Sequence, residues 1–381
     1  MNPRLSAHLD LLRVLAALVV LFSHFAYARF SRGDYLFVRE WNLGSDAVVV
    51  FFVLSGYVVA HTAARPGMTL GRFAFARLTR LYSVVIPALI LTIVFDRIGV
   101  AIDPAVYDGW WWNPAPFLEV LARGLTFSTE WSGSGFRPGT NGPFWSISYE
   151  AAYYALFGVW IFMRSWPRTL LFVAALALFG LKPLALAPAW LLGVWLRRRE
   201  DLIVGDRAAL ALALLPLAIY AAAVDIGLPP LLMAITQVSI GPEATAALRF
   251  SDEFLWNALL GALVVVHLIG VRSLGAVRPD RKPGWGRPAT WLAGATFSIY
   301  LVHYPALQLL DALLPQDAAP ILRDAGLLLG ALGVSLIFAQ AFERTLPMLR
   351  RSLEGRGAAE PLNRRPAQPK DRAKVERSLT D

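Results

Sequence analysis

Long apolar runs, separated by short polar and basic segments, dominate this sequence of 381 residues. A helix needs about 20 mostly apolar residues to cross the hydrocarbon core of a bilayer. Ten segments meet or approach that length, namely 9–28, 45–64, 81–101, 142–163, 169–182, 184–197, 208–226, 253–271, 289–311 and 323–346. The pattern predicts an all-α integral membrane protein, a bundle of about ten transmembrane helices. The short fifth and sixth segments can instead form one bent segment, with Pro183 and Pro188 at the bend.

The basic residues recur along the chain in a way that orients these helices. With a cytoplasmic N-terminus, the cytoplasmic loops and tail carry Arg65, Arg72, Arg77, Arg80, Arg164, Arg168, Arg197, Arg198, Arg199, Arg272, Arg278, Arg281, Lys282, Arg287, Arg350 and Arg351. The opposite loops carry few cations and several acids, among them Asp103, Asp108 and Glu119. Cytoplasmic loops are enriched in Lys and Arg. Both termini are therefore predicted to be cytoplasmic, in a multi-pass protein of the inner (cytoplasmic) membrane.

Composition narrows the classes of function. Hydrophobic residues make up 56% of the chain and charged residues 17%, well below the roughly 25% charge of soluble domains. Cysteine is absent, which excludes disulfides and a thiol nucleophile. The five histidines show no metal-ligand spacing, so no metal site is expected. The net charge of +9 is explained by the basic loops, and no nucleic-acid-binding motif is present.

Two regions follow from the pattern. Residues 1–350 are predicted to form one transmembrane domain, and residues 351–381, rich in Pro, Arg, Lys and Glu, a basic disordered cytoplasmic tail. The longest predicted outside loop, 102–141, contains Trp110-Trp111-Trp112. These tryptophans either stack on sugar rings or anchor the loop at the membrane interface. A short re-entrant piece is expected in 227–252.

Ionisable residues within a span cost about 2.5–3.5 kcal/mol on insertion scales, so each needs a reason. Arg13 and His24 are eleven residues apart in the first predicted helix, which places both on one face about 16 Å apart. An extended donor with an anionic head can meet Arg13 while its far end reaches His24, a candidate general base. In the alternative, Arg13 pairs with Asp10 and His24 hydrogen-bonds a neighbour.

Arg77 and Arg80 share a face of a predicted cytoplasmic segment. Guanidinium groups suit phosphate oxygens, so these residues are candidates for donor binding. An orientation signal or a contact with lipid head groups is the alternative.

A second polar motif opens the fourth predicted span, Trp145-Ser-Ile-Ser-Tyr-Glu150. Ser146 and Glu150 share a helix face, and Glu150 can orient an imidazole or pair with a buried arginine. The ninth span adds a polar stripe of Thr296, Tyr300 and His303, which either binds substrate or hydrogen-bonds another helix.

The remaining polar features of the spans favour structural roles. Ser55-Gly56 in the second span predicts a close helix contact. His8 and His61 lie near predicted cytoplasmic boundaries and are expected to be solvated, whereas His267 stands alone on an apolar span and is expected to be structural.

Taken together, these motifs resemble the acyltransferase 3 family of integral membrane acyltransferases. The matching segments, in family order, are Arg13 to His24, Asp46-Ala-Val-Val-Val-Phe51-Phe-Val-Leu-Ser55-Gly56-Tyr, Arg77-Leu-Thr-Arg80-Leu-Tyr, Trp145-Ser-Ile-Ser-Tyr-Glu150 and Ser298-Ile-Tyr300-Leu-Val-His303. Two departures are Ile147, where Leu is usual, and Asn141-Gly-Pro, where many members have a histidine.

The resemblance implies transfer of an acyl group, acetyl by default, from cytoplasmic acyl-CoA to a hydroxyl of an extracytoplasmic glycan. It implies that His24 takes part in acyl transfer, as a general base or transient acyl carrier, with Glu150 assisting. It also implies donor binding by Arg13, Arg77 and Arg80. Ser146, Ser148, Tyr300 and His303 are the candidate acceptor-binding residues. The expected partners are the lipid bilayer, acyl-CoA, the glycan acceptor and glycan-assembly proteins.

A transporter or flippase for a glycan-related substrate is the alternative function, because transporters also place polar residues at mid-membrane. No internal repeat supports it. The sequence leaves open the acyl group, the acceptor, and the choice between direct transfer and an acyl-histidine intermediate.

Overall fold

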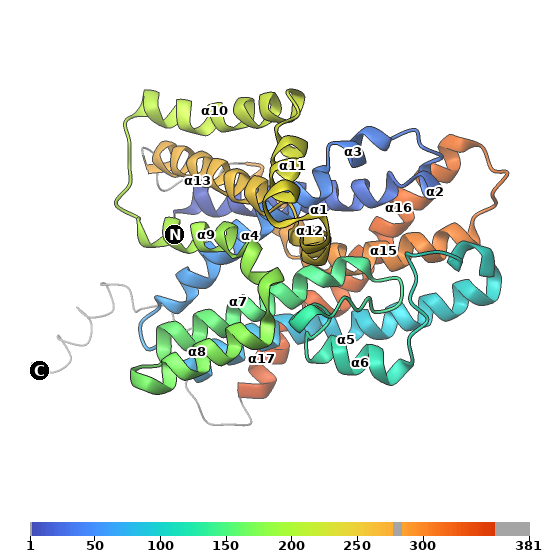
Figure 1. Ribbon diagram of the computed structural model, residues 1–381, viewed down its shortest axis with the longest axis horizontal. Helices are drawn as coiled ribbons and strands as arrows, with labels where there is room; N and C mark the ends of the chain where they lie inside the picture. The colour runs from blue at the N-terminus through green and yellow to red at the C-terminus, as the bar shows by residue number, and fades with distance from the viewer. Residues whose placement is uncertain (1, 277–283, 355–381) are drawn as a thin grey trace, which may run out of the picture.

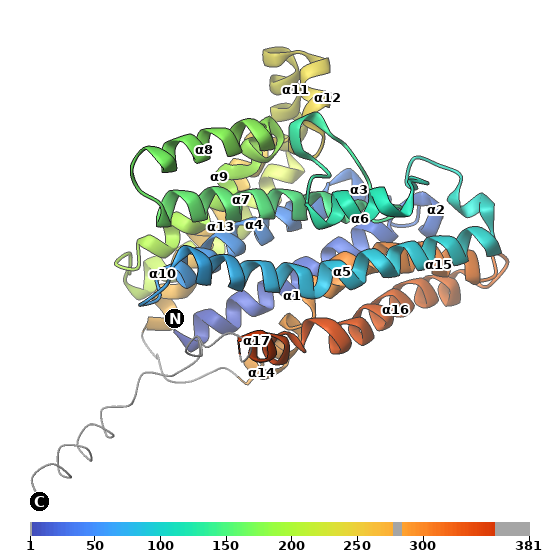
Figure 2. The same ribbon diagram turned by 90° about the horizontal axis from the view of Figure 1, so that it is seen from below.

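The computed structural model of the protein describes residues 2–276 and 284–354. Every regular element in these ranges is a helix, as the apolar pattern predicts, and the long ones run roughly alongside one another (Figure 1, Figure 2). The longer helices are α1 (Pro3–Phe25), α4 (Leu43–Ala63), α5 (Leu70–Ile102), α7 (Trp145–Phe162), α8 (Ser165–Phe179), α9 (Leu181–Arg198), α10 (Asp206–Asp225), α11 (Leu228–Ile240), α13 (Phe254–Ala276), α15 (Thr296–Leu313) and α16 (Pro320–Phe338).

Several of these helices are long and apolar enough to cross a membrane, which makes the chain a multi-pass membrane protein. In the described ranges six candidates meet that test, or seven if α8 and α9 form one bent span. Each of the ten segments expected from the sequence does contain a helix. The count of ten spans and the cytoplasmic position of both termini stay predictions.

The break between α8 and α9 differs from the expected one. The two helices meet at an angle of 115°, and the residue between them, Gly180, has φ of +78°, a left-handed conformation that glycine adopts without strain. Pro183 and Pro188 both lie within α9. The prediction of a bend at these prolines was therefore wrong, because backbone freedom at a glycine makes the turn.

The close contact expected at Ser55-Gly56 is confirmed between α4 and α9. A methyl group on Gly56 would lie 2.0 Å from the carbonyl oxygen of Trp190, and one on Gly193 would lie 2.0 Å from that of Val53. The two backbones touch at both places, so neither glycine tolerates a side chain here. Small residues of this kind allow close packing of helices in membranes.

α1 lies in the middle of the bundle, where it packs against α4, α15 and the short helix α14 (Gly286–Ala293) (Figure 2). The outer face of α15 is covered by α5 and α16. This arrangement brings the motifs of the first, second, fourth and ninth predicted spans around one interior region.

Short elements fill the two long connections. The 102–141 connection holds α6 (Phe117–Leu125) and the 3₁₀ turns η1 (Pro104–Tyr107) and η2 (Trp131–Gly133), and η3 (Gly142–Phe144) follows it. The 227–252 connection holds α11, α12 (Pro242–Leu248) and η4 (Arg249–Ser251), and α11 with α12 projects from the body (Figure 2). Most of the expected tail, 355–381, lies outside the described residues, as do Arg278, Arg281 and Lys282.

Candidate active site

A cavity of about 970 Å³ opens between α1, α4, α5, α7 and α15. Its lining includes the three predicted donor-binding residues Arg13, Arg77 and Arg80, and also Ser146, Glu150 and Tyr300. Residues that lie far apart in the sequence therefore share one chamber, as the resemblance implies.

The three arginines are held by few fixed contacts. Arg13 forms an ion pair with Asp10 at 3.6 Å, the pairing considered from the sequence, yet both residues still line the cavity. Arg77 donates to the hydroxyl of Thr62 at 3.3 Å, and its Nε is buried without a hydrogen-bond partner in the described part of the chain. Unused donors of this kind are available to a phosphate.

Glu150 lies on the cavity wall rather than beside a histidine. Its Oε1 accepts from the hydroxyls of Ser55, at 2.6 Å, and Tyr154. Within the described ranges no hydrogen bond joins it to either imidazole of the site. Its position favours a role in shaping the polar wall of the cavity over the orientation of an imidazole.

The two serines of the fourth-span motif separate. Ser146 is buried and bonds the hydroxyl of Tyr300 at 2.7 Å, on the cavity lining. Ser148 is fully buried and bonds Thr129 at 2.6 Å and the carbonyl of Phe127. Ser148 thus anchors the segment before η2, a position that favours a structural role over substrate binding.

His24 and His303 form a pair next to Tyr300. His303 Nε2 lies 3.1 Å from His24 Nδ1, and the rings of His303 and Tyr300 are 6.4 Å apart. His303 is completely buried, whereas His24 is partly exposed. The polar stripe expected on the ninth span therefore meets the first helix at the candidate catalytic residue.

Hydrogen bonds fix the tautomers of this pair when both rings are neutral. His303 Nδ1 lies 2.7 Å from the carbonyl oxygen of Ile299 and must donate to it, because a carbonyl only accepts. His303 Nε2 then accepts from His24 Nδ1–H, which also faces the carbonyl of Val20 at 2.9 Å. His24 Nε2 is left without a proton, as a general base or nucleophile requires.

Comparison with known proteins decides the family. Residues 6–340 match the acyltransferase 3 family, described as an acyltransferase domain. The chain belongs to this family. Acyltransferase MdmB of Streptomyces mycarofaciens is 32% identical over 155 residues, which cover 39% of the chain and 37% of that relative. The match thus spans little more than a third of the relative's length. No solved structure matches.

The acyltransferase 3 chain has more cations around its cavity than sequence reasoning assigned to it. Arg65, Arg350 and Arg351 also line the chamber. Arg350 belongs to the C-terminal helix α17 (Leu346–Glu354) and donates to Thr79 at 2.9 Å and to the carbonyl of Ala76. Arg350 and Thr79 are 271 positions apart in the sequence, so spacing alone gave no signal for this contact.

Glu343 is the second residue that sequence reasoning missed. It lies in a π-helical segment, η5 (Ala339–Glu343), and its side chain is buried. One carboxylate oxygen pairs with Arg80 at 3.1 Å, and the other accepts from the backbone and hydroxyl of Ser298, both at 2.8 Å. Glu343 thereby holds Arg80 against the start of α15.

His8 and His267 form another pair, which corrects two expectations. His8 Nε2 lies 2.8 Å from His267 Nε2, and His267 Nδ1 lies 2.7 Å from the carbonyl of Ala213. His8 is therefore not a freely solvated residue, and His267 is not alone. Neither lines the large cavity.

Proposed function

We propose that this acyltransferase transfers an acyl group, acetyl by default, from acyl-CoA to a hydroxyl of a glycan or glycosylated acceptor. The donor enters the cationic cavity from the cytoplasm, and the acceptor approaches His24 from the other side of the inner membrane. Family membership makes the chain an O-acyltransferase rather than a transporter. The donor, the acceptor and the sidedness are the proposal.

One observation carries the proposal: a single cavity joins the arginines to the residues beside the histidine pair. Six arginines line it, namely Arg13, Arg65, Arg77, Arg80, Arg350 and Arg351, against the two carboxylates Asp10 and Glu150. Such an excess of cations suits a donor with several phosphate groups, such as CoA. Phe51, Ser146 and Tyr300 continue the lining toward His303.

In direct transfer, His24 Nε2 takes the proton of the acceptor hydroxyl. The oxygen attacks the thioester carbonyl and forms the new C–O bond. The C–S bond then breaks, and the thiolate receives the proton from the imidazolium. His303 holds the imidazole in the required tautomer through the bond to Nδ1, much as a carboxylate orients histidine in hydrolases.

In the alternative route, His24 Nε2 itself attacks the thioester. The acyl-imidazole that forms is then attacked by the acceptor hydroxyl, and the thiolate leaves in the first step. Both routes use the same nitrogen. A labelled acyl group that stays on the protein when the acceptor is left out would select this route.

The test compares exported glycans by mass spectrometry in a strain that lacks the gene and in strains restored with the unchanged protein, His24→Ala or His8→Ala. We expect a mass difference of one acyl group, restored by the unchanged protein and by His8→Ala but not by His24→Ala. Restoration by His24→Ala would refute both routes. The absence of any acyl difference, in glycans or small glycosylated products, would refute the proposed function.

A further inference from the structure

A second group of arginines surrounds His24 at the end of α1, away from the cavity-lining Arg13. It consists of Arg29, Arg39 and Arg137 with the aromatic residues Tyr27, Trp110 and Tyr304, and we call it the arginine–aromatic cluster. The ring of His24 lies 4.9 Å from that of Tyr304 and 6.1 Å from that of Tyr27. The cluster therefore begins at the proposed reaction centre.

All the polar contacts of these arginines are to neutral groups. Arg39 donates to Ser23 at 3.2 Å and to the hydroxyl of Tyr27 at 3.0 Å. Arg29 donates to Gln308 and, at 2.9 Å, to Tyr304, while its Nε is buried with no hydrogen-bond partner among the described residues.

The third arginine follows the same pattern. Arg137 donates to the carbonyl of Trp110 at 2.7 Å and lies over the ring of that residue. Among the residues that the structure describes, no carboxylate forms an ion pair with Arg29, Arg39 or Arg137.

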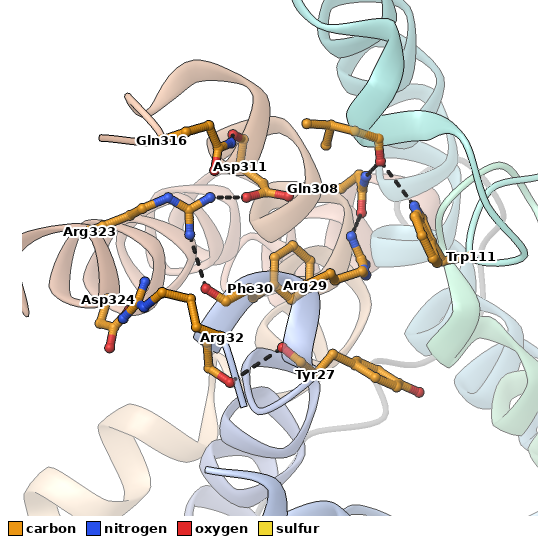
Figure 3. Close-up of polar contacts among 12 residues, drawn as sticks. Tyr27, Arg29, Phe30, Arg32, Trp111, Gln308, Asp311, Gln316, Arg323 and Asp324 are labelled. Carbon is orange, nitrogen blue, oxygen red and sulfur yellow. Dashed lines mark hydrogen bonds and ion pairs between the residues drawn. The ribbon is translucent and has the colours of Figure 1, made fainter. Parts of the chain in front are cut away.

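Other cations at this end of the molecule do have carboxylate partners. Arg323 pairs with Asp311, and Arg32 pairs with Asp324 at 2.8 Å, whereas the neighbouring Arg29 meets only the amide of Gln308 (Figure 3). The contrast shows that carboxylates were placed for some arginines and withheld from the cluster.

The nearest acid to Arg137 is also engaged elsewhere. Glu130 pairs with Lys182 at 2.9 Å and with Arg249 at 3.3 Å. Burial lowers the pKa of Arg137, so the protein alone does not compensate this charge. A partly buried cation without a counter-ion is costly, and a bound anion would remove that cost.

We propose that the arginine–aromatic cluster binds an acceptor that carries a negatively charged group, a carboxylate or a phosphate, on or next to the sugar that is acylated. This inference rests on the proposed function and names its substrate class. Guanidinium groups bind such anions through paired hydrogen bonds. Trp110, whose residue surface is 64% exposed, offers a flat face to a sugar ring.

The spread of the cluster favours a charged substrate over stabilisation of the reacting oxygen alone. Ring contacts lead from His24 to Tyr27 and then to Trp110, with centroids 6.1 Å and 5.8 Å apart, and Arg137 lies beyond them on Trp110. Charge at that distance from the imidazole recognises a substrate group next to the reacting hydroxyl.

The first test identifies the acylated residue by fragmentation mass spectrometry of the product that differs between strains with and without the gene. We expect this residue to be acidic or to be linked directly to an acidic residue, and the fragment mass tells uronate from phosphate. Acylation within a neutral acceptor would overturn the inference and leave the proposed function intact. The absence of an acylated product would overturn both.

The second test measures the acceptor KM of purified protein in vesicles with that acceptor. Arg39→Gln and Arg137→Gln should each raise it about tenfold or more, the loss of one charge-assisted hydrogen bond, with the donor KM unchanged. Arg39→Lys should retain part of the affinity, and Arg32→Gln, which alters a paired arginine at the same end, should leave the acceptor KM unchanged.

A change in the ligand avoids effects on folding. Neutralising the acceptor, by reduction of its carboxylate to an alcohol or removal of its phosphate, should lower kcat/KM for the unchanged protein by a similar factor. Equal kcat/KM for the charged and neutralised acceptors would overturn the inference.

Discussion

Two histidine pairs lie along α1, and they differ in their surroundings rather than in their hydrogen bonds. In each pair the partner ring donates Nδ1–H to a backbone carbonyl, so its Nε2 accepts from the histidine on α1. Both His8 and His24 are thereby left with one unprotonated nitrogen. Only His24 has the arginine–aromatic cluster on one side and the cationic cavity, through Tyr300, on the other. A basic nitrogen is common, and access to two substrates makes it catalytic.

The largest expected effect comes from removing the α1 histidine of each pair in turn. His24→Ala should lower acyl transfer by at least the ~10²–10⁴-fold that a positioned general base supplies. His8→Ala should leave the rate close to that of the unchanged protein. The rates are measured in vesicles with labelled acyl-CoA. Similar losses in both variants would show that the surroundings do not distinguish the pairs.

The next effect concerns the cavity that only one pair adjoins. Arg77→Gln or Arg80→Gln removes a charge-assisted hydrogen bond to the donor, worth about 1.5–3 kcal/mol, and should raise the donor KM about 10- to 150-fold. Arg72→Gln is the matched control, because Arg72 is exposed on the same helix and bonds only local groups, Gly67 and Thr69. A comparable rise for Arg72→Gln would point to a general charge effect.

A smaller effect is expected at the buried partner of His24. His303→Phe removes the nitrogen that accepts from His24 Nδ1–H, although the carbonyl of Val20 still favours the same tautomer. We expect a reduced kcat with an unchanged donor KM, a loss below that of His24→Ala. His303→Gln, whose side-chain oxygen can accept, should recover part of the rate. Equal kcat values for the Phe and Gln variants would contradict the orienting role.

The smallest effect is expected at the other pair. His267→Phe removes the hydrogen bonds to His8 and to the carbonyl of Ala213, each worth roughly 1 kcal/mol net. It should lower the melting temperature of the protein in detergent without changing the transfer rate. A clear loss of rate in a protein that melts normally would give the second pair a role in the reaction.

Most of the fold could be predicted from the sequence, because apolar runs of membrane length specify helices directly. The bend at Gly180 could not, since the positive φ of a glycine is set by how the two helices pack, whereas proline draws attention in any sequence. The helical spacing that placed Arg13 and His24 on one face was informative for the same reason as the apolar runs: it depends only on local geometry.

Partners across helices were the part that sequence could not supply. Nothing local indicates that His303 meets His24, that Glu343 holds Arg80, or that Ser148 faces a loop and Ser146 the cavity. The unpaired state of Arg29 and Arg39 is likewise a property of the assembled bundle, since it depends on carboxylates being absent from other helices. Pairing is decided by tertiary packing, which single-sequence patterns do not report.

The π-helical segment at the end of α16 has a consequence for how this chain tolerates insertions and deletions. Its signature bond runs from Arg344 N to the carbonyl of Ala339, five residues back, at 2.9 Å, so it holds one residue more than a regular turn. Deleting a single residue there would restore the ordinary ladder and rotate everything downstream by about 100°. α17 would turn its arginines away from α5. The register of the final helix thus hangs on one extra residue, and length changes that a loop would absorb unnoticed would here strip the cavity of part of its charge.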